Sequence, residues 1–274
     1  MPFMPTTLPR TLLTLFACVA FWTLPAAGQI GSLPQELVRK TGVLTAAETD
    51  AVASYVAPLM ADLASDDAAA RGRARTGRIE PLNTSGVSVA FQQAYTEAVS
   101  PGLGPLTQSD SIPVRIAAVE AAGWLGTLEG WQLVQANLDH PQPGVRMAAA
   151  VAVRTLLVAA SARAPAINAT GTGAIVRGVT QRLEVEPNAF VADGLVRTLL
   201  QGGQLVGVSG YEAAGRSAWD ALGEHLPSRV FATRSETDHA AEQSRLTLLG
   251  TLEYFRSTNG LVRPTGVDDA IVRA

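Results

Sequence analysis

The amino-acid sequence predicts an all-α protein, built as a short α-solenoid in which helix pairs stack and flanking helices cap the stack. First, alanine is abundant and aromatic residues make up only 5% of the chain, which favours closely packed helices over strands. Second, apolar residues recur at steps of three and four, the spacing of one helix face. Third, one such pattern returns along the chain as an internal repeat.

The repeat is clearest in two segments that lie 31 residues apart. Six positions of the first return in the second, and five residue types are identical: Val114, Ala117, Ala118, Ala121, Ala122 and Leu125 become Val145, Ala148, Ala149, Ala152, Val153 and Leu156. A third copy lies 43 residues further on, where Val153-Arg154-Thr155-Leu156-Leu157 returns as Val196-Arg197-Thr198-Leu199-Leu200. We place its extra length in a loop at 164–173. Because one helix pair cannot bury both of its apolar faces, we expect the pairs to stack.

Further helices are expected on both sides of the repeats and between them. Thr45 and Glu48 have the spacing of a capping box, and an apolar stripe continues from there to Leu63. Other helices are expected at 67–80, 91–99, 131–138, 211–226 and 235–256. Glycine and proline predict breaks at 100–104 and at Pro227.

The turn before each of the first two repeat helices has a shared pattern, Asp110-Ser111-Ile112-Pro113-Val114-Arg115 and Asp139-His140-Pro141-Gln142-Pro143-Gly144-Val145-Arg146. It resembles the HEAT-repeat family of armadillo-like proteins, especially the short form known from bilin-lyase-like proteins. The resemblance covers residues 105–202. It implies that Asp110, Arg115, Asp139 and Arg146 are structural, tying turns to neighbouring helices. Residues 29–104 and 203–274 are then helical flanks, the second with a loose tail after Asn259.

The first 28 residues have the order of a secretory signal peptide. Arg10 precedes an apolar run, and the small residues Ala26 and Gly28 predict cleavage before Gln29. We therefore expect an exported protein, periplasmic or secreted. The only cysteine, Cys18, lies in this segment, so disulfides are not expected to hold the fold. If Cys18 were lipidated or the leader retained, the protein would be tethered to a membrane.

The densest basic patch carries Arg71, Arg75 and Arg78 on one helix face. One interpretation is an anion site, and the other, which we favour, is a solvated face balanced by nearby aspartates. The net charge of the chain is −3, which predicts no nucleic-acid partner.

No catalytic residue, cofactor or metal site is predicted. His225 and His239 lack the spacing of a metal pair, and the glycines at 171–178 and 207–210 are expected in loops.

The sequence therefore favours a non-enzymatic scaffold that binds a protein or peptide partner. The alternatives are a lyase-like enzyme that uses polar groove residues such as Glu120 or Asp193, and a membrane-tethered envelope subunit. Trp124, Trp131 and Trp219 are expected in core or interhelix packing, whereas a tryptophan exposed on a concave surface would anchor a partner.

Overall fold

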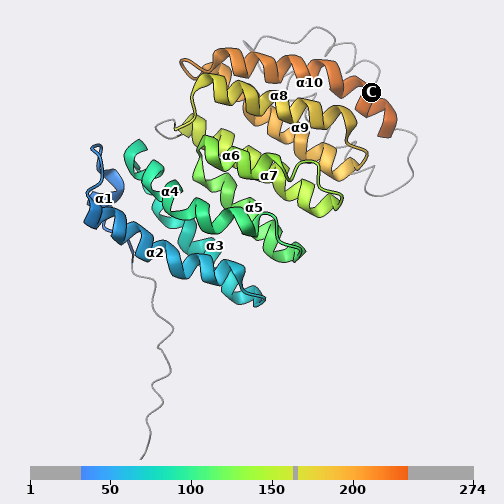
Figure 1. Ribbon diagram of the computed structural model, residues 1–274. Helices are drawn as coiled ribbons and strands as arrows, with labels where there is room; N and C mark the ends of the chain where they lie inside the picture. Colours follow the sequence, from blue (N-terminus) through green and yellow to red (C-terminus); the bar gives the residue numbers. More distant parts are fainter. Residues whose placement is uncertain (1–31, 163–165, 234–274) are drawn as a thin grey trace, which may run out of the picture. The chain divides into compact units, whose positions relative to one another are not determined.

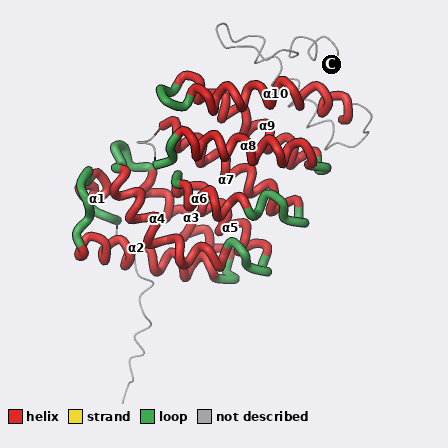
Figure 2. The backbone as a smooth tube through the Cα atoms, turned by 45° about the horizontal axis from the view of Figure 1, so that its top comes forward, coloured by secondary structure: helices red, strands yellow, loops and turns green. Residues whose placement is uncertain are grey.

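In the computed structural model, residues 32–162 and 166–233 are described, without the side chains at 78–80, 161–162 and 226–233. These ranges contain no β-strand, which confirms the all-α class (Figures 1 and 2). The elements are α1 (Gln35–Arg39), α2 (Ala46–Ala64), α3 (Ala68–Leu82), α4 (Val89–Leu106), α5 (Ile112–Leu125), α6 (Leu128–Gln135), α7 (Pro143–Ala162), α8 (Ala169–Val185), α9 (Ala189–Gly203), the short 3-10 helix η1 (Gln204–Gly207) and α10 (Glu212–Thr233).

Polar side chains define where several helices begin. At α2 the predicted capping box is present, because Thr45 accepts the backbone N–H of Glu48 and the Glu48 carboxylate accepts that of Thr45. A hydrogen bond from Lys40, together with the bonds from Thr45, lowers the pKa of Glu48 to about 2. Asn168 and Asn188 cap α8 and α9 by accepting the N–H groups of Gly171 and Val191.

The helices contact one another in two rows (Figure 1). The even row consists of α2, α4, α6, α8 and α10, and the odd row consists of α3, α5, α7 and α9; in both rows each helix packs on the next. Each odd-row helix also packs on the even-row helix that precedes it in the chain. The strongest packing runs through the odd row, where α7 lies between α5 and α9.

The repeated apolar positions are the contact face of the odd row. Nearly all of them are buried on α5, α7 and α9: Val114, Ala118, Ala121, Ala122, Leu125, Val145, Ala148, Ala149, Ala152, Val153, Leu156, Val191, Ala192, Leu195, Val196 and Leu199. Ala117 is only partly buried, and Asn188 lies before α9 as its cap. Burial of each valine or leucine contributes about 1.5–3 kcal/mol, so this face supplies much of the hydrophobic stabilisation.

Two breaks expected from glycine and proline are helical instead, and one expected loop is shorter than predicted. The prediction of a break at 100–104 is wrong, because α4 continues to Leu106 with Leu103 fully buried. Packing explains this outcome: a Cβ at Gly102 would lie only 3.1 Å from Cγ of Met60 on α2, so the small residue suits a close helix contact. The expected loop at 164–173 ends at Asn168, where α8 begins. The expected break at Pro227 is also wrong, since α10 continues to Thr233.

The remaining expectations for the two ends of the chain lie outside the described residues. They concern the signal peptide at 1–28, the helix at 235–256 and the loose tail after Asn259. Within the described part, one segment, Pro143–Ala160 of α7, is long and apolar enough to cross a membrane, and 61% of it is buried inside the fold. A core helix of a folded protein has the same composition, so this segment is weak support for a membrane span.

We predict that Gly123→Ala destabilises the protein by about 1–3 kcal/mol, because the odd row has no room for a larger side chain there. A Cβ at Gly123 on α5 would lie 2.6 Å from the carbonyl oxygen of Ala152 on α7. Urea unfolding followed by circular dichroism measures the effect.

The matched control is Gly72→Ala in α3, where no atom lies within 4 Å of the added Cβ. This change should stabilise the protein by about 0.5–1 kcal/mol, since it only removes backbone freedom from the unfolded chain. Equal effects of the two changes would contradict close α5–α7 packing.

Candidate functional site

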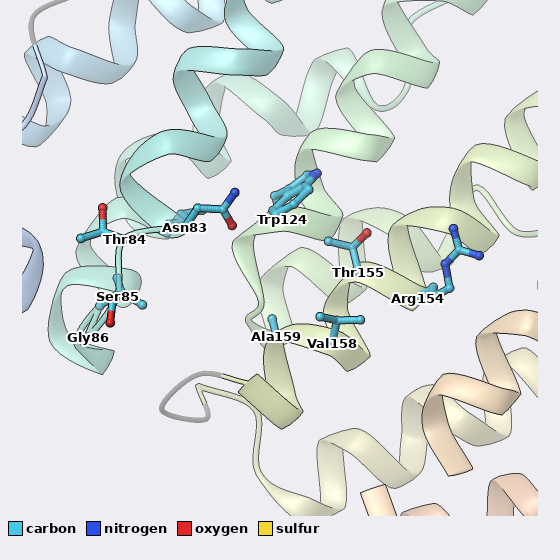
Figure 3. Close-up of a pocket in the computed structure, with 11 residues that line it drawn as sticks. Asn83, Thr84, Ser85, Gly86, Trp124, Arg154, Thr155, Val158 and Ala159 are labelled. Atoms are coloured by element: carbon cyan, nitrogen blue, oxygen red, sulfur yellow. The ribbon is translucent and has the colours of Figure 1, made fainter. Parts of the chain in front are cut away.

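A groove of about 590 Å³ lies between the loop after α3 and the outward face of α7. The loop 83–87 forms one wall, and Arg154, Thr155, Val158 and Ala159 of α7 form the other. The Trp124 side chain, from the last turn of α5, lies between the two walls (Figure 3). The volume is in the range of sites that hold a small molecule or a short stretch of peptide.

The loop wall is held in place by the first segment of the described chain. Ser88 donates its hydroxyl to the carbonyl of Lys40 at 2.6 Å, and its backbone N–H donates to Val38 at 3.0 Å. Arg39 donates through Nε to the carbonyl of Ser85 at 3.0 Å. Gly86 has a φ of +79°, a left-handed conformation that a side chain would strain. The turn is therefore fixed from two sides, and it presents a defined surface to the groove.

Trp124 is held in place because the end of α5 is tied to α4. The helix stops at Gly126, which has a φ of +65°. The buried side chain of Gln92 on α4 donates its amide to the carbonyls of Leu125 and Gly126, at 2.7 and 3.2 Å. These bonds satisfy carbonyl groups at the helix end, which have no partner within the helix.

Among the described residues that line the groove, Arg154 alone is charged. Its half-buried side chain forms no hydrogen bond or ion pair with the described residues. Arg197 occupies the equivalent position in the third repeat, where Nε bonds Asp193 one helical turn earlier at 2.9 Å. The residue one turn before Arg154 is Ala150, so the groove arginine lacks the carboxylate that neutralises its counterpart.

Arg115 bonds three polar side chains around the turn before α7. Nε donates to Asn137 at 2.9 Å, one Nη donates to Gln108 at 2.9 Å, and the other lies 3.1 Å from Nε2 of His140. Burial and then the positive charge of Arg115 lower the pKa of His140. Asp110 is exposed and makes no hydrogen bond or ion pair with any residue in the described ranges.

Arg146 belongs to a buried ionic cluster that joins α7 to the turn between α8 and α9. Nε and Nη2 each donate to a carboxylate oxygen of Glu186 at 2.8 Å, while Nη1 donates to the carbonyls of His140 and Pro141. Arg182 also binds Glu186, at 2.7 Å, and it reaches Asp139, which is 79% exposed, at 3.1 Å. The structural residues expected from the turn pattern therefore fall into two clusters that meet at His140, and Asp110 joins neither.

Burial alone would raise the pKa of Glu186. Hydrogen bonds from Arg146, Arg182 and the backbone N–H of Asn188 outweigh this effect and lower the pKa. Since the Glu186 side chain is fully buried, loss of its charge would leave two arginines without their partner.

The predicted basic patch lies along α3, beside a second hollow of about 230 Å³ between α3 and α5. Arg71 donates to the carbonyl of Ser65 at 2.7 Å, and Arg75 lies 3.4 Å from the carboxylate of Glu120. Asp67 accepts the backbone N–H groups of Ala69 and Ala70, which lowers its pKa. The Arg78 side chain lies outside the described residues.

The acidic residues considered for an enzyme take part in ion pairs, Glu120 with Arg75 and Asp193 with Arg197. Among the described residues, no three histidine, cysteine or carboxylate side chains form a group that could hold a metal ion. The glycines at 171–178 lie inside α8 instead of a loop, whereas Gly207 ends η1 and Gly210 lies in the turn before α10. Trp131 and Trp219 are buried, and of the three tryptophans only Trp124 lines the groove.

Sequence reasoning missed the groove and the acid of the buried cluster. Arg182 and Glu186 have the i, i+4 spacing of a helical ion pair, which was available as a signal. The equivalence of Arg154 and Arg197 in the repeat was a second signal, because only one of them has an acid four residues earlier. The loop wall gave no comparable pattern.

The comparisons with known proteins add no family. No protein-family model matches the chain, and no curated protein matches it either. Its function is therefore argued from the residues and their geometry.

We predict that Glu186→Gln lowers the free energy of unfolding at neutral pH by up to about 3–5 kcal/mol. The difference in the free energy of unfolding between the variant and the unchanged protein, which we call the gap, should disappear in acid. An unfolded glutamate titrates near 4.5 and the folded Glu186 titrates lower. The stabilisation is therefore present above pH 4.5 and is lost as the pH falls through the folded pKa. Urea unfolding of both proteins across this range measures the gap.

Glu97→Gln is the control, because this carboxylate is exposed on α4. We expect a change within about 0.5 kcal/mol at each pH. A gap for Glu186→Gln that stays constant down to strongly acid pH would contradict a charged Glu186 in the fold.

Proposed function

We propose that this chain is an exported, non-enzymatic α-solenoid of HEAT-like helix pairs that binds a segment of a protein partner in the groove beside α7. Export is inferred from the order of charge, apolar run and small residues in the first 28 positions. The two rows of helices support the solenoid, since each pair packs on the next pair in chain order. The repeated faces of α5, α7 and α9 form the inside of one row.

The turn residues fit the proposed repeat. Arg115 and Arg146 occupy the same position in the first and second copies, and each bonds groups of the turn between α6 and α7. In this proposal they set how one pair is placed on the next, while Asp139 contributes through Arg182. The regions 29–104 and 203–274 then act as the caps of the stack.

The groove is the observation that carries the binding function. It combines an aromatic side chain, an exposed aliphatic side chain and an unpaired cation: Trp124, Val158, which is 43% exposed, and Arg154. Aromatic residues and arginine supply most of the binding energy in protein interfaces, so this combination suits a partner. A rigid loop wall also limits the entropy lost on binding.

A photo-crosslinking amino acid placed at Val158 tests this function in living cells. We expect defined adducts with one or a few proteins of the cell envelope or medium, and Trp124→Ala in the same chain should abolish them. The adducts are separated by electrophoresis and identified by mass spectrometry.

The same amino acid at Arg216, exposed on α10 of the even row, is the control for random encounters. Adducts that are equal at both positions, or that survive Trp124→Ala, would contradict a partner site in the groove.

A further inference from the structure

The groove and the second hollow carry an excess of positive charge, whereas the whole chain is negative. The described residues that line the groove and the second hollow between α3 and α5 include three arginines and one carboxylate: Arg71, Arg75, Arg154 and Glu120. The chain itself has a net charge of −3. A local excess of positive charge on an acidic protein favours an anionic partner at this place, by attraction and by exclusion of basic competitors.

The second hollow lies between α3 and α5, and the groove begins at the C-terminal ends of the same two helices. The second hollow is lined by 68–75 of α3 and 113–120 of α5, and the groove begins at Leu82 and Trp124 on the same two helices. Leu82 comes seven positions after Arg75, which is about 10 Å along a helix. An extended peptide advances about 3.3 Å per residue, so about three residues cover this distance.

Arg154 adds a specific anchor to this charge. A guanidinium binds a carboxylate through two parallel hydrogen bonds, and the bond is strongest where water is partly excluded. Arg154 lines the groove and has no acid among the described residues to bind, whereas Arg197 already binds Asp193. The groove therefore has one unused bidentate donor beside an apolar surface.

Resting on the proposed function, we infer that the partner segment is an extended, acidic peptide that runs from the groove to the second hollow. One apolar side chain packs on Trp124 and Val158, and a neighbouring carboxylate binds Arg154. A second carboxylate, about three residues away, lies against Arg71 and Arg75, where it competes with Glu120 for Arg75.

Selection of random peptides displayed on phage against the purified full chain tests this inference. We expect the selected peptides to share an apolar residue with acidic residues on one side of it. Arg154→Gln should weaken the affinity for a selected synthetic peptide about tenfold, since a charge-assisted hydrogen-bond pair is lost. Arg154→Glu should select peptides with lysine or arginine at the position that was acidic.

Arg197→Gln and Arg197→Glu are matched controls, because they change the equivalent residue of the next repeat outside the groove. Both should select the same acidic peptides as the unchanged protein. Circular dichroism of all four variants shows that each is folded, which is expected because both side chains are at least partly exposed.

The outcomes distinguish the acidic-peptide inference from the proposed binding function. Peptides that need Trp124 but show no acidic residue, or whose affinity ignores Arg154→Gln, would overturn the acidic-peptide inference and leave the binding function intact. Failure to select any peptide would contradict both. A further outcome is that polyglutamate binds as tightly as a selected peptide, and binds the Trp124→Ala variant equally well. Binding would then be unspecific charge attraction, and the inference would be overturned.

Discussion

The close packing of α7 between α5 and α9 is the constraint on which the rest of the structure depends. The helices approach so closely that Gly123 on α5 leaves no room for a Cβ against the backbone of Ala152, and Gly194 on α9 lies against the flexible thioether of Met147. Thr198 of α9 donates its hydroxyl to the carbonyl of Ala150 on α7 at 2.9 Å, which adds a polar bond to this apolar contact. Small side chains thus let the backbones meet, and the larger apolar residues of the repeat fill the space around them.

This packing also surrounds the groove that we propose as the partner site. The repeated apolar positions are used for packing, and the positions beside them differ between copies. Position 123 is glycine in the first copy, and its equivalents are Arg154 and Arg197; position 124 is tryptophan, and its equivalents are both threonine. The groove lies where these differences coincide, between the aromatic ring of one copy and the unpaired cation of the next. In this account the repeat supplies the frame, and the departures from it supply the chemistry.

The sequence predicts the parts of the fold that follow from local spacing. The faces of α5, α7 and α9 and the cap at Thr45 are visible because their residues recur within a few positions. The predicted break in α4 fails because its outcome depends on Met60 and a buried Leu103, and the contact with Met60 has no local signal. The spacing from Arg182 was a local signal for Glu186, but its burial was missed because its partner Arg146 is 40 residues away and a glutamate is usually exposed. The groove joins residues from 82 to 159, so no single window contains it.

The most direct test of the central packing claim is a disulfide between α7 and α9, introduced as Ala150→Cys with Gly194→Cys in a Cys18→Ser background. A Cβ at Gly194 would lie 3.5 Å from that of Ala150, a separation that a disulfide accepts, and the nearby thioether of Met147 is flexible enough to move. Mild oxidation of the folded protein should join the two cysteines within one chain, and peptide mass spectrometry would show the link. The control is Gly72→Cys with Gly194→Cys. These positions lie on α3 and α9, which are not neighbours in the odd row, so this pair should stay reduced. Free thiols in the folded Ala150→Cys/Gly194→Cys protein, or links only between chains, would contradict the packing of α7 against α9 and the account built on it.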